Sequence, residues 1–336
     1  PRYKTCAGGL QDRTIDLIPF DIKNTIQKSL DSILFSFRGH DSFTRKYSST
    51  IIHTVDRREF DHFLAARAIE NGCIVRFGEE VIDFESNNGG VTVRTGNGKY
   101  SSKILVGADG IRGLVHRRII GRAAILKILG YELEKKSGPD EDREKKEHIG
   151  LDFGGSPKGY LWTFPRKDVI SYGIGGPVGT ARLMRKYFGQ CLKKDVFGNN
   201  WTGQKIMAQC IPIRTENTPL CRERILLIGD AACLGDGFTG EGLYNAFRSS
   251  HAALEGIVSA LKRSEFSFKD YRESVKNSIY PDIKGSLTFS RIFFTYPLFF
   301  YKLLKTNDRF FKLCCKVLKG SKNYSDISGR LNLFGR

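Results

Sequence analysis

Apolar positions recur at helical spacing in three stretches of the chain. From Phe60 to Ala68 they follow a period near 3.6, with Asp56 as the N-cap and Asn71-Gly72 as a stop signal. A second helical pattern extends over residues 240–261, and a third over residues 183–192. The patterns predict three helices at these places.

Short apolar runs bounded by turn residues predict strands. The runs are Cys73–Phe77, Val81–Phe84, Val91–Arg94, Lys103–Val106 and Arg224–Ile228. Asn87-Asn88-Gly89-Gly90, between the second and third runs, is a hairpin signal. Residues 125–221 are also mostly strand-like, apart from the charged stretch 132–148, which we expect to be a solvated loop at a sheet edge. Helices alternating with strands around this middle predict an α/β nucleotide-binding layer interrupted by a β-rich substrate layer.

The C-terminal stretch 284–322 combines nine basic residues with many phenylalanines, and Asp308 is its one acidic residue. Pro297 divides it into two predicted short helices. Amphipathic basic and aromatic helices bind membrane interfaces, but the same pattern fits a helical lid whose phenylalanines belong to the core. Both interpretations stay open.

The charge balance favours anionic partners. The chain has 54 Lys and Arg against 36 Asp and Glu, a net charge of +18. A non-catalytic nucleic-acid binder is the weaker interpretation, because the basic residues are spread and the aromatics gather on an apolar tail. The eight cysteines show no metal-binding spacing, and the apolar stretches are shorter than the ~20 residues of a membrane-spanning helix. We expect reduced thiols in a cytoplasmic protein.

Two strands run into Gly-Asp turns, where open α/β sheets bind ligands. One turn contains Asp109 and Gly110, and the other begins at Gly229-Asp230. Asp230 can accept hydrogen bonds from a polyol, and the glycines up to Gly242 let a backbone approach a flat ring at a helix N-terminus. A third small-residue turn, Cys6-Ala7-Gly8-Gly9, would let a cofactor lie against the backbone. Each turn alone also fits an ordinary tight connection.

The stretch GYLWTFPRKDVISYGIGG, residues 159–176, joins an aromatic alternation to a glycine alternation. A sheet edge closed by Pro165 would account for it. A wall of aromatic faces for a flat or apolar ligand accounts for it equally well.

Taken in order, these motifs resemble the geranylgeranyl reductases of the para-hydroxybenzoate-hydroxylase-like flavoproteins, from Pro1 to about Leu261. The matches are the Cys6–Gly9 turn, the Arg57/Phe60/Asp61 helix start, Gly107–Gly110, Gly229–Gly242 and the Pro157-x-x-Tyr160-x-Trp162-x-Phe164-Pro165 signature. The chain departs from the family pattern at Gly113, at Val115-His116 and at Arg166. It also shows no opening Gly-x-Gly-x-x-Gly unit, so we expect an N-terminally truncated chain.

The resemblance implies a Rossmann-like FAD-binding layer, without its first βαβ unit, interrupted by a sheet-rich substrate domain. Residues 1–12, 53–123 and 222–262 would bind FAD, residues 13–52 and 124–221 would bind substrate, and residues 263–336 would form the helical C-terminal region. The implied FAD contacts are Cys6, Ala7, Gly9, Arg57, Val81, Asp109, Gly110, Asp230, Gly242 and Leu243. The implied substrate contacts are Tyr160, Trp162, Phe164 and Pro165.

The implied reaction saturates C=C bonds of a geranylgeranyl chain in a membrane lipid or isoprenoid ester. Cys6 is the candidate catalytic residue, which would donate a proton or gate movement of the flavin, with a small-residue packing role as the alternative. Ferredoxin or NAD(P)H would supply electrons, and the protein would be cytoplasmic or peripheral on an anionic membrane. The alternative within the superfamily is an FAD-dependent monooxygenase or halogenase.

Overall fold

The computed structural model describes residues 3–137, 146–193 and 205–324. The chain packs into two compact units of mixed α/β structure, which confirms the predicted fold class. Unit 1 comprises residues 1–66, 128–210 and 285–336, and unit 2 comprises residues 67–127 and 211–284. The predicted assignment of cofactor, substrate and C-terminal regions stays a prediction.

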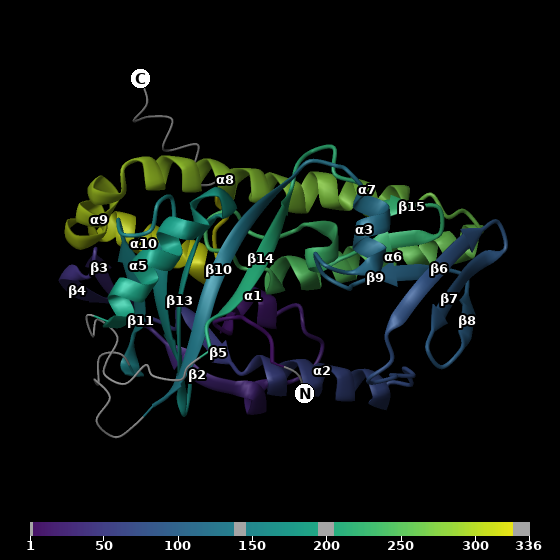
Figure 1. The fold of residues 1–336 in the computed structure, drawn as a ribbon, viewed down its shortest axis with the longest axis horizontal. Coiled ribbons are helices and arrows are strands. Elements are labelled where there is room, and N and C mark those ends of the chain that lie inside the picture. Colours follow the sequence, from purple (N-terminus) through teal and green to yellow (C-terminus); the bar gives the residue numbers. More distant parts are fainter. Residues whose placement is uncertain (1–2, 138–145, 194–204, 325–336) are drawn as a thin grey trace. The chain divides into compact units, whose positions relative to one another are not determined.

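A seven-stranded sheet dominates the strand-rich middle of the chain (Figure 1). In spatial order its strands are β14 (Met207–Arg214), β10 (Ile125–Lys136), β13 (Val169–Pro177), β12 (Tyr160–Pro165), β11 (Ile149–Phe153), β3 (Ser32–Phe37) and β4 (His40–Lys46). Strands β11 and β3 pair in parallel, whereas β10, β13, β12 and β11 form an antiparallel series. Alternation along each strand therefore separates two faces of this sheet.

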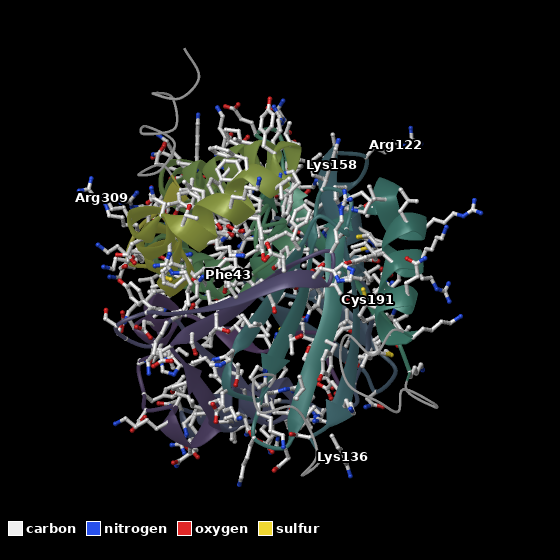
Figure 2. The ribbon with its side chains drawn as sticks, turned by 90° about the vertical axis from the view of Figure 1, so that its left-hand side faces the viewer. Phe43, Arg122, Lys136, Lys158, Cys191 and Arg309 are labelled. Carbon is white, nitrogen blue, oxygen red and sulfur yellow. The ribbon has the colours of Figure 1, made fainter. Side chains whose placement is uncertain are left out.

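Helix α5 (Ala181–Lys193) covers one face. Its buried Met184, Phe188 and Cys191 pack against a cluster that includes Leu133, Leu161, Ile170, Tyr172 and Ile174. Figure 2 shows Cys191 on α5, beside the strands of this sheet. The cluster forms a closed apolar core on this side of the sheet.

Phenylalanines from the C-terminal helices pack on the β11–β3 end of the other face. These helices are α8 (Tyr280–Thr295), α9 (Pro297–Thr306) and α10 (Asp308–Lys319). Phe153 meets Phe293 at 5.0 Å between ring centroids, and Phe35 meets Phe311 at 6.3 Å. The predicted break at Pro297 is confirmed, and the phenylalanines named above belong to the core. The stretch forms three helices and not the predicted two, because α9 also ends at Asn307, whose side chain accepts the Phe310 N–H and caps α10. Within the ranges that the structure describes, the helices lack the combined length and hydrophobicity that a membrane crossing needs.

A small second sheet in unit 1 anchors the N-terminal turn. Its strand order is β1 (Gly9–Leu10), β5 (Ile52–Val55) and β2 (Ile26–Leu30), all antiparallel. Helix α1 (Asp12–Ile15) follows β1, and helix α2 (Arg57–Glu70) follows β5. Asp56 accepts the backbone N–H of Arg58 at 2.8 Å, which confirms the predicted N-cap of α2.

Unit 2 has a short sheet with the order β15 (Cys221–Arg222), β16 (Ile225–Leu227) and β9 (Leu105–Gly107), where β16 and β9 are parallel. Both parallel strands run into the Gly-Asp turns. Helix α3 (Leu114–Ile120) follows one turn, and helix α6 (Leu243–Arg263) follows the other; α7 (Lys269–Ser274) packs on α6. A separate antiparallel sheet of β6 (Val81–Asn87), β7 (Gly90–Thr95) and β8 (Lys99–Ser102) contains the predicted hairpin.

The predicted strand at Cys73–Phe77 is wrong. These residues form no strand, and their large apolar side chains are exposed, Ile74 at 85% and Phe77 at 67%. A strand is held by its neighbour's hydrogen bonds, and no ladder partner for this segment exists among the residues described in Figure 1. An apolar run by itself is therefore not sufficient to form a strand.

The predicted solvated loop at 132–148 is wrong at its beginning. Glu132–Lys136 continues strand β10, and Glu132 is fully buried, while residues 138–145 lie outside the described residues. The charged residues belong to the strand because β10 pairs with β13 as far as Lys136 and because Arg166 pairs with Glu134.

We expect Phe188→Ala to lower the free energy of unfolding by about 3–5 kcal/mol, because the ring is 1% exposed in the α5 core. Leu183→Ala on the same helix is the matched control. Leu183 is 57% exposed, so its truncation should change stability by no more than about 0.5 kcal/mol. Urea unfolding of both variants measures the difference, and equal losses would show that α5 does not pack as described.

Candidate active site

The aromatic residues of β12 share one face of the large sheet. Tyr160, Trp162 and Phe164 are partly exposed, whereas the alternating Leu161 and Thr163 are buried on the α5 face. The aromatic side chains are thus the accessible ones in this strand. The sheet-edge interpretation of this stretch is wrong, because β12 lies between β13 and β11 inside the sheet. That the three rings form a wall for a ligand stays a prediction.

Glycines on the neighbouring strands make room for the indole of Trp162. Gly173 is opposite both Trp162 and Glu132 in the ladders. A Cβ at Gly173 would come within 2.1 Å of Cζ2 of the indole, and a Cβ at Gly175 or Gly130 would lie 3.3 or 3.4 Å from the ring. The glycine alternation that follows the aromatic strand therefore lets the ring lie against the sheet backbone.

The Cys-Ala-Gly-Gly turn lies next to this strand in unit 1. Gly8 has φ +79°, and a Cβ there would be 2.1 Å from the carbonyl oxygen of Val55. The N–H of Val55 donates a hydrogen bond to the carbonyl oxygen of Gly8 at 2.9 Å. A Cβ at Gly9 would lie 3.2 Å from Cε1 of Phe164. Sγ of Cys6 accepts the Gly8 N–H at 3.4 Å. The structure thus brings the predicted turn and the aromatic strand together.

The other predicted residues of unit 1 also gather here. The guanidinium of Arg57 is buried and donates to both carboxylate oxygens of Asp61, at 2.7 and 2.9 Å. Burial opposes its charge, but its contacts with Cys6 and Asp61 hold the pKa of Arg57 above its usual range. Pro165 is an exception: it is buried on the same face of β12 as Leu161, opposite Ile170 of the α5 core, so it does not line the aromatic face. Its carbonyl accepts the hydroxyl of Thr54 at 3.0 Å. Ala7 is partly exposed in the turn.

Glu132 is a site residue that the sequence analysis missed. Its side chain is 0% exposed, and its Oε1 accepts the hydroxyl of Ser171 at 2.5 Å. The Ser171 oxygen in turn accepts Nε1–H of Trp162 at 3.4 Å. Within the described ranges, Oε2 of Glu132 has no hydrogen-bond partner. A fully buried carboxyl group therefore lies in the same row as the indole.

Burial raises the pKa of Glu132 to about 7. Ser171, Arg166 and a backbone contact with Cys6 oppose this shift, whereas Glu134 adds to it. Arg166 is 3% exposed and is itself shared, because it pairs with Glu134 and lies 3.5 Å from Asp56. The available signal in the sequence was the alternation of Glu132 and Glu134 with Tyr131 and Leu133, which fits a strand with a polar face.

In unit 2, the two Gly-Asp turns use their carboxylates differently. Both oxygens of Asp109 are occupied by helix α3, since they accept the N–H groups of Val115 at 2.7 Å and His116 at 3.3 Å. A Cβ at Gly113 would lie 1.8 Å from the carboxyl carbon of Asp109, so glycine at this family departure makes the contact possible. Asp109 therefore acts as a helix cap.

Asp230 is available to a ligand. Its partly exposed carboxylate has no hydrogen-bond partner in residues 3–137, 146–193 and 205–324, and it would lie 3.2 Å from a Cβ at Gly242. Leu243 begins the 21-residue helix α6 at this point. Gly110, with φ +70°, has no atom within 4 Å of a Cβ position. An exposed acceptor, a helix N-terminus and an open glycine together fit a large anionic cofactor.

Two further contacts order these turns. The ring of His116 is buried, and its Nδ1 lies 2.8 Å from the carbonyl oxygen of Ala231, which joins α3 to the turn that contains Asp230. Glu241 accepts the N–H of Tyr244 at 2.7 Å in the first turn of α6. Val81, the remaining predicted residue, is the exposed first residue of β6. The FAD contacts themselves stay predictions.

We expect Asp109→Ala to lower the free energy of unfolding by about 1–2 kcal/mol, the usual cost of a lost helix cap. Asp230→Ala is the control, with an expected change below about 0.5 kcal/mol because that carboxylate makes no hydrogen bond in the described part of the chain. Thermal and urea unfolding without cofactor measure both. A larger loss for Asp230→Ala would contradict this assignment.

Glu132 should make stability fall as pH rises. Its ordinary pKa is 4.5, and its folded-state pKa is about 7, so between these values the folded chain holds a proton that the unfolded chain has released. The expected loss is about 3 kcal/mol by pH 8 relative to pH 4. Urea unfolding of Glu132→Gln should show a shallower decline over pH 4–8, whereas Glu59→Gln, an exchange of an exposed carboxylate, should keep the full decline.

Comparison with known proteins supports the resemblance. No family model matches the chain. An uncharacterized protein of Methanosarcina barkeri is 28% identical over 296 residues, 88% of this chain and 75% of that protein. Digeranylgeranylglycerophospholipid reductase 2 of Methanothermobacter thermautotrophicus is 25% identical over 71% of this chain and 64% of its own length. A 1H-pyrrole-2-carbonyl-[peptidyl-carrier protein] chlorinase of Pseudomonas fluorescens is 26% identical over 74% of this chain and 59% of its own length.

Two solved structures show the same fold. A geranylgeranyl bacteriochlorophyll reductase-like protein from Thermoplasma acidophilum has a TM-score of 0.69 at 19% identity, over 85% of this chain and 77% of its own. A flavin-dependent brominase also has a TM-score of 0.69, at 16% identity, over 98% of this chain and 89% of its own. The chain is therefore a distant homologue of proteins named digeranylgeranylglycerophospholipid reductase, with the fold of geranylgeranyl-reductase-like and flavin-dependent halogenase structures.

Proposed function

We propose that the protein is an FAD-dependent reductase that saturates C=C bonds in the geranylgeranyl chains of a membrane lipid or isoprenoid ester. The observation that carries this proposal is the accessible aromatic row Tyr160, Trp162 and Phe164 beside the Cys6–Gly9 turn. Relatives named digeranylgeranylglycerophospholipid reductase support the same substrate class.

The aromatic row suits a flexible hydrocarbon. Flat apolar rings contact a polyisoprenoid chain over a large area and require no polar partner from it. An isolated alkene has no carbonyl group to polarise, so catalysis depends on holding the double bond in position and excluding water. Trp162, which is held against the glycines of β10 and β13, is a rigid surface for this purpose.

The residues of unit 2 fit FAD. The partly exposed carboxylate of Asp230 would accept hydrogen bonds from the ribityl chain. Gly242 and Leu243 at the start of α6 would meet an anionic edge, and Gly110 leaves room for the cofactor. In unit 1, Cys6, Ala7 and Gly9 are the corresponding candidates. Reduced FAD supplies a hydride when bound. Cys6, which is partly exposed, is our candidate for the side chain that gives a proton to the substrate.

Arg57 supports that role for Cys6. The guanidinium contacts Cys6, and its bidentate pair with Asp61 fixes its orientation. A buried cation next to a thiol stabilises the thiolate that remains after proton donation. We therefore assign Arg57, one of the implied FAD contacts, to the Cys6 region of the site.

A second candidate is a flavin-dependent halogenase or monooxygenase. The chlorinase relative and the brominase fold favour it. The two functions differ in their use of oxygen, because a halogenase or monooxygenase consumes O₂ in proportion to product and an alkene reductase does not. Oxygen uptake by the reduced enzyme in the presence of each substrate class distinguishes them.

We also propose that the enzyme contacts an anionic membrane and receives electrons from ferredoxin or NAD(P)H. Tyr296, Leu298 and Phe299 are exposed where α8 meets α9, at 62%, 47% and 60%. Arg291 and Lys302 are exposed on the two flanking helices, and Arg309 points away from α10 in Figure 2. Apolar side chains surrounded by cations favour an interface with anionic lipid.

The decisive experiment expresses the enzyme in a host that makes geranylgeranylated phospholipid, followed by mass spectrometry of the extracted lipids. We expect masses that rise by pairs of hydrogens. Trp162→Ala should lower the reduction rate about tenfold or more, because a lost contact of about 1.4 kcal/mol in the transition state has this effect. Its FAD content should stay unchanged.

Thr163→Ser is the matched control, since Thr163 is on the same strand but on the α5 face. It should reduce lipid at the wild-type rate. Unchanged lipid from an FAD-loaded enzyme supplied with ferredoxin or NADPH would reject the proposed function.

A further inference from the structure

The proposed function leaves the buried carboxyl group of Glu132 without a role. Its side chain is 0% exposed, and one of its two oxygens has no hydrogen-bond partner within the described ranges. An isolated ionised carboxylate is strongly disfavoured in such a place, and an unpartnered buried oxygen is uncommon in folded proteins. A carboxyl group that keeps a proton on Oε2 is neutral, so it avoids the cost of burying a charge.

The position of Glu132 connects it to the reacting region. It is directly opposite Gly173, which is in turn opposite Trp162, so the carboxyl group and the indole share one face of the sheet. The Ser171 hydroxyl links the two side chains through hydrogen bonds of 2.5 and 3.4 Å. The backbone of Cys6 also contacts the carboxyl group. Glu132 and Ser171 are fully buried and Cys6 is partly exposed, so of these three side chains the Cys6 thiol is the one that a substrate can reach.

The surrounding charges do not neutralise Glu132. Arg166 is the cation that acts on it, but this guanidinium donates to Glu134 and is 3.5 Å from Asp56. Glu134, from the same strand, repels a second negative charge. Tyr3, from the N-terminal segment, is neutral, since burial and the two glutamates hold its pKa above the usual range. Arg58 also pairs with Asp56 and lies 3.8 Å from Glu134. Both guanidinium groups are therefore engaged with Asp56 and Glu134, which leaves Glu132 to be protonated near neutral pH.

We propose that Oε2 of Glu132 holds a proton and relays it to the thiol of Cys6 each time the site saturates a double bond. This inference rests on the proposed function. One alkene carbon receives the hydride with its two electrons. The S–H bond of Cys6 then breaks as a C–H bond forms at the other carbon, and Arg57 stabilises the thiolate. The O–H bond of Glu132 breaks as the S–H bond re-forms, and a proton taken up from solvent then replaces the one that Glu132 has lost. Each saturated double bond thus consumes one hydride and one solvent proton. Glu132 is thus a positioning residue that acts through Cys6.

Asp152 provides a matched control in the same sheet. It is also buried and carboxylic, but it faces α5, and both of its oxygens are hydrogen-bonded. Oδ2 accepts from Ser36 at 2.8 Å and from the Gly39 N–H at 2.6 Å, and Oδ1 accepts the Tyr187 hydroxyl at 2.9 Å. A buried carboxyl group is therefore no proton donor by itself, and Asp152→Asn should leave the reaction unchanged.

The test compares Glu132→Gln, Glu132→Asp and Asp152→Asn in the FAD-loaded enzyme over pH 5–9. We expect Glu132→Gln to reduce lipid about tenfold or more slowly and to lose the fall in rate that wild type shows above about pH 7. Glu132→Asp should recover part of the rate, and Asp152→Asn should keep the wild-type profile. An active wild type whose Glu132→Gln variant keeps both rate and profile overturns the relay alone. A wild type that reduces no isoprenoid overturns the proposed function and the relay with it.

Infrared spectroscopy gives a readout that is independent of turnover. The C=O band of a protonated carboxyl group should titrate with a midpoint near pH 7 in wild type and be absent in Glu132→Gln, while Asp152→Asn keeps it. This measurement on wild type also covers the case in which Glu132→Gln does not fold. A wild-type spectrum without a carboxyl group that titrates near neutrality overturns the proposal.

Discussion

The close approach of the Trp162 indole to the backbone of β10 and β13 is the contact on which the candidate site depends. Glycine at 173 is required for it, since a side chain there would overlap the ring, and Gly130 and Gly175 lie in close contact with the same ring. The indole then lies against the sheet, with Tyr160 and Phe164 on the same face, and Phe164 reaches the turn at Gly9. The opposite face is left to the apolar core under α5.

The face of the large sheet that carries Trp162 also carries charged side chains, and their charges are not paired one to one. Arg166 is paired with Glu134, so the neighbouring Glu132 receives only part of its field. A hydrophobic surface that also holds one protonated carboxyl group is suited to a reaction that needs a dry alkene and a proton in the same place. The hydrogen bonds from Trp162 through Ser171 to Glu132 connect the aromatic row to the buried carboxyl group across adjacent strands.

The two Gly-Asp turns of unit 2 show how similar motifs diverge. Each follows a parallel strand, and each precedes a helix. Asp109 is bound by the backbone of α3, whereas Asp230 makes no hydrogen bond in the described part of the chain and faces the start of a helix three times as long. Only the second turn offers an acceptor to a cofactor, although both matched the family pattern equally well.

Local patterns in the sequence determined the helices over 57–70, 181–193 and 243–263, the hairpin at Asn87–Gly90, the aromatic strand and its glycines, and the family resemblance. These features depend on neighbours in the chain, so periodicity and turn chemistry suffice to find them. The tertiary structure alone decided that Cys73–Phe77 is not a strand and that Glu132 is buried, because strand pairing and ion pairing join residues far apart in sequence. In the sequence, Glu132 is one of many charged residues in a row and cannot be distinguished from them. The pairing of β10 with β13 buries it and places it on the same face of the sheet as Trp162.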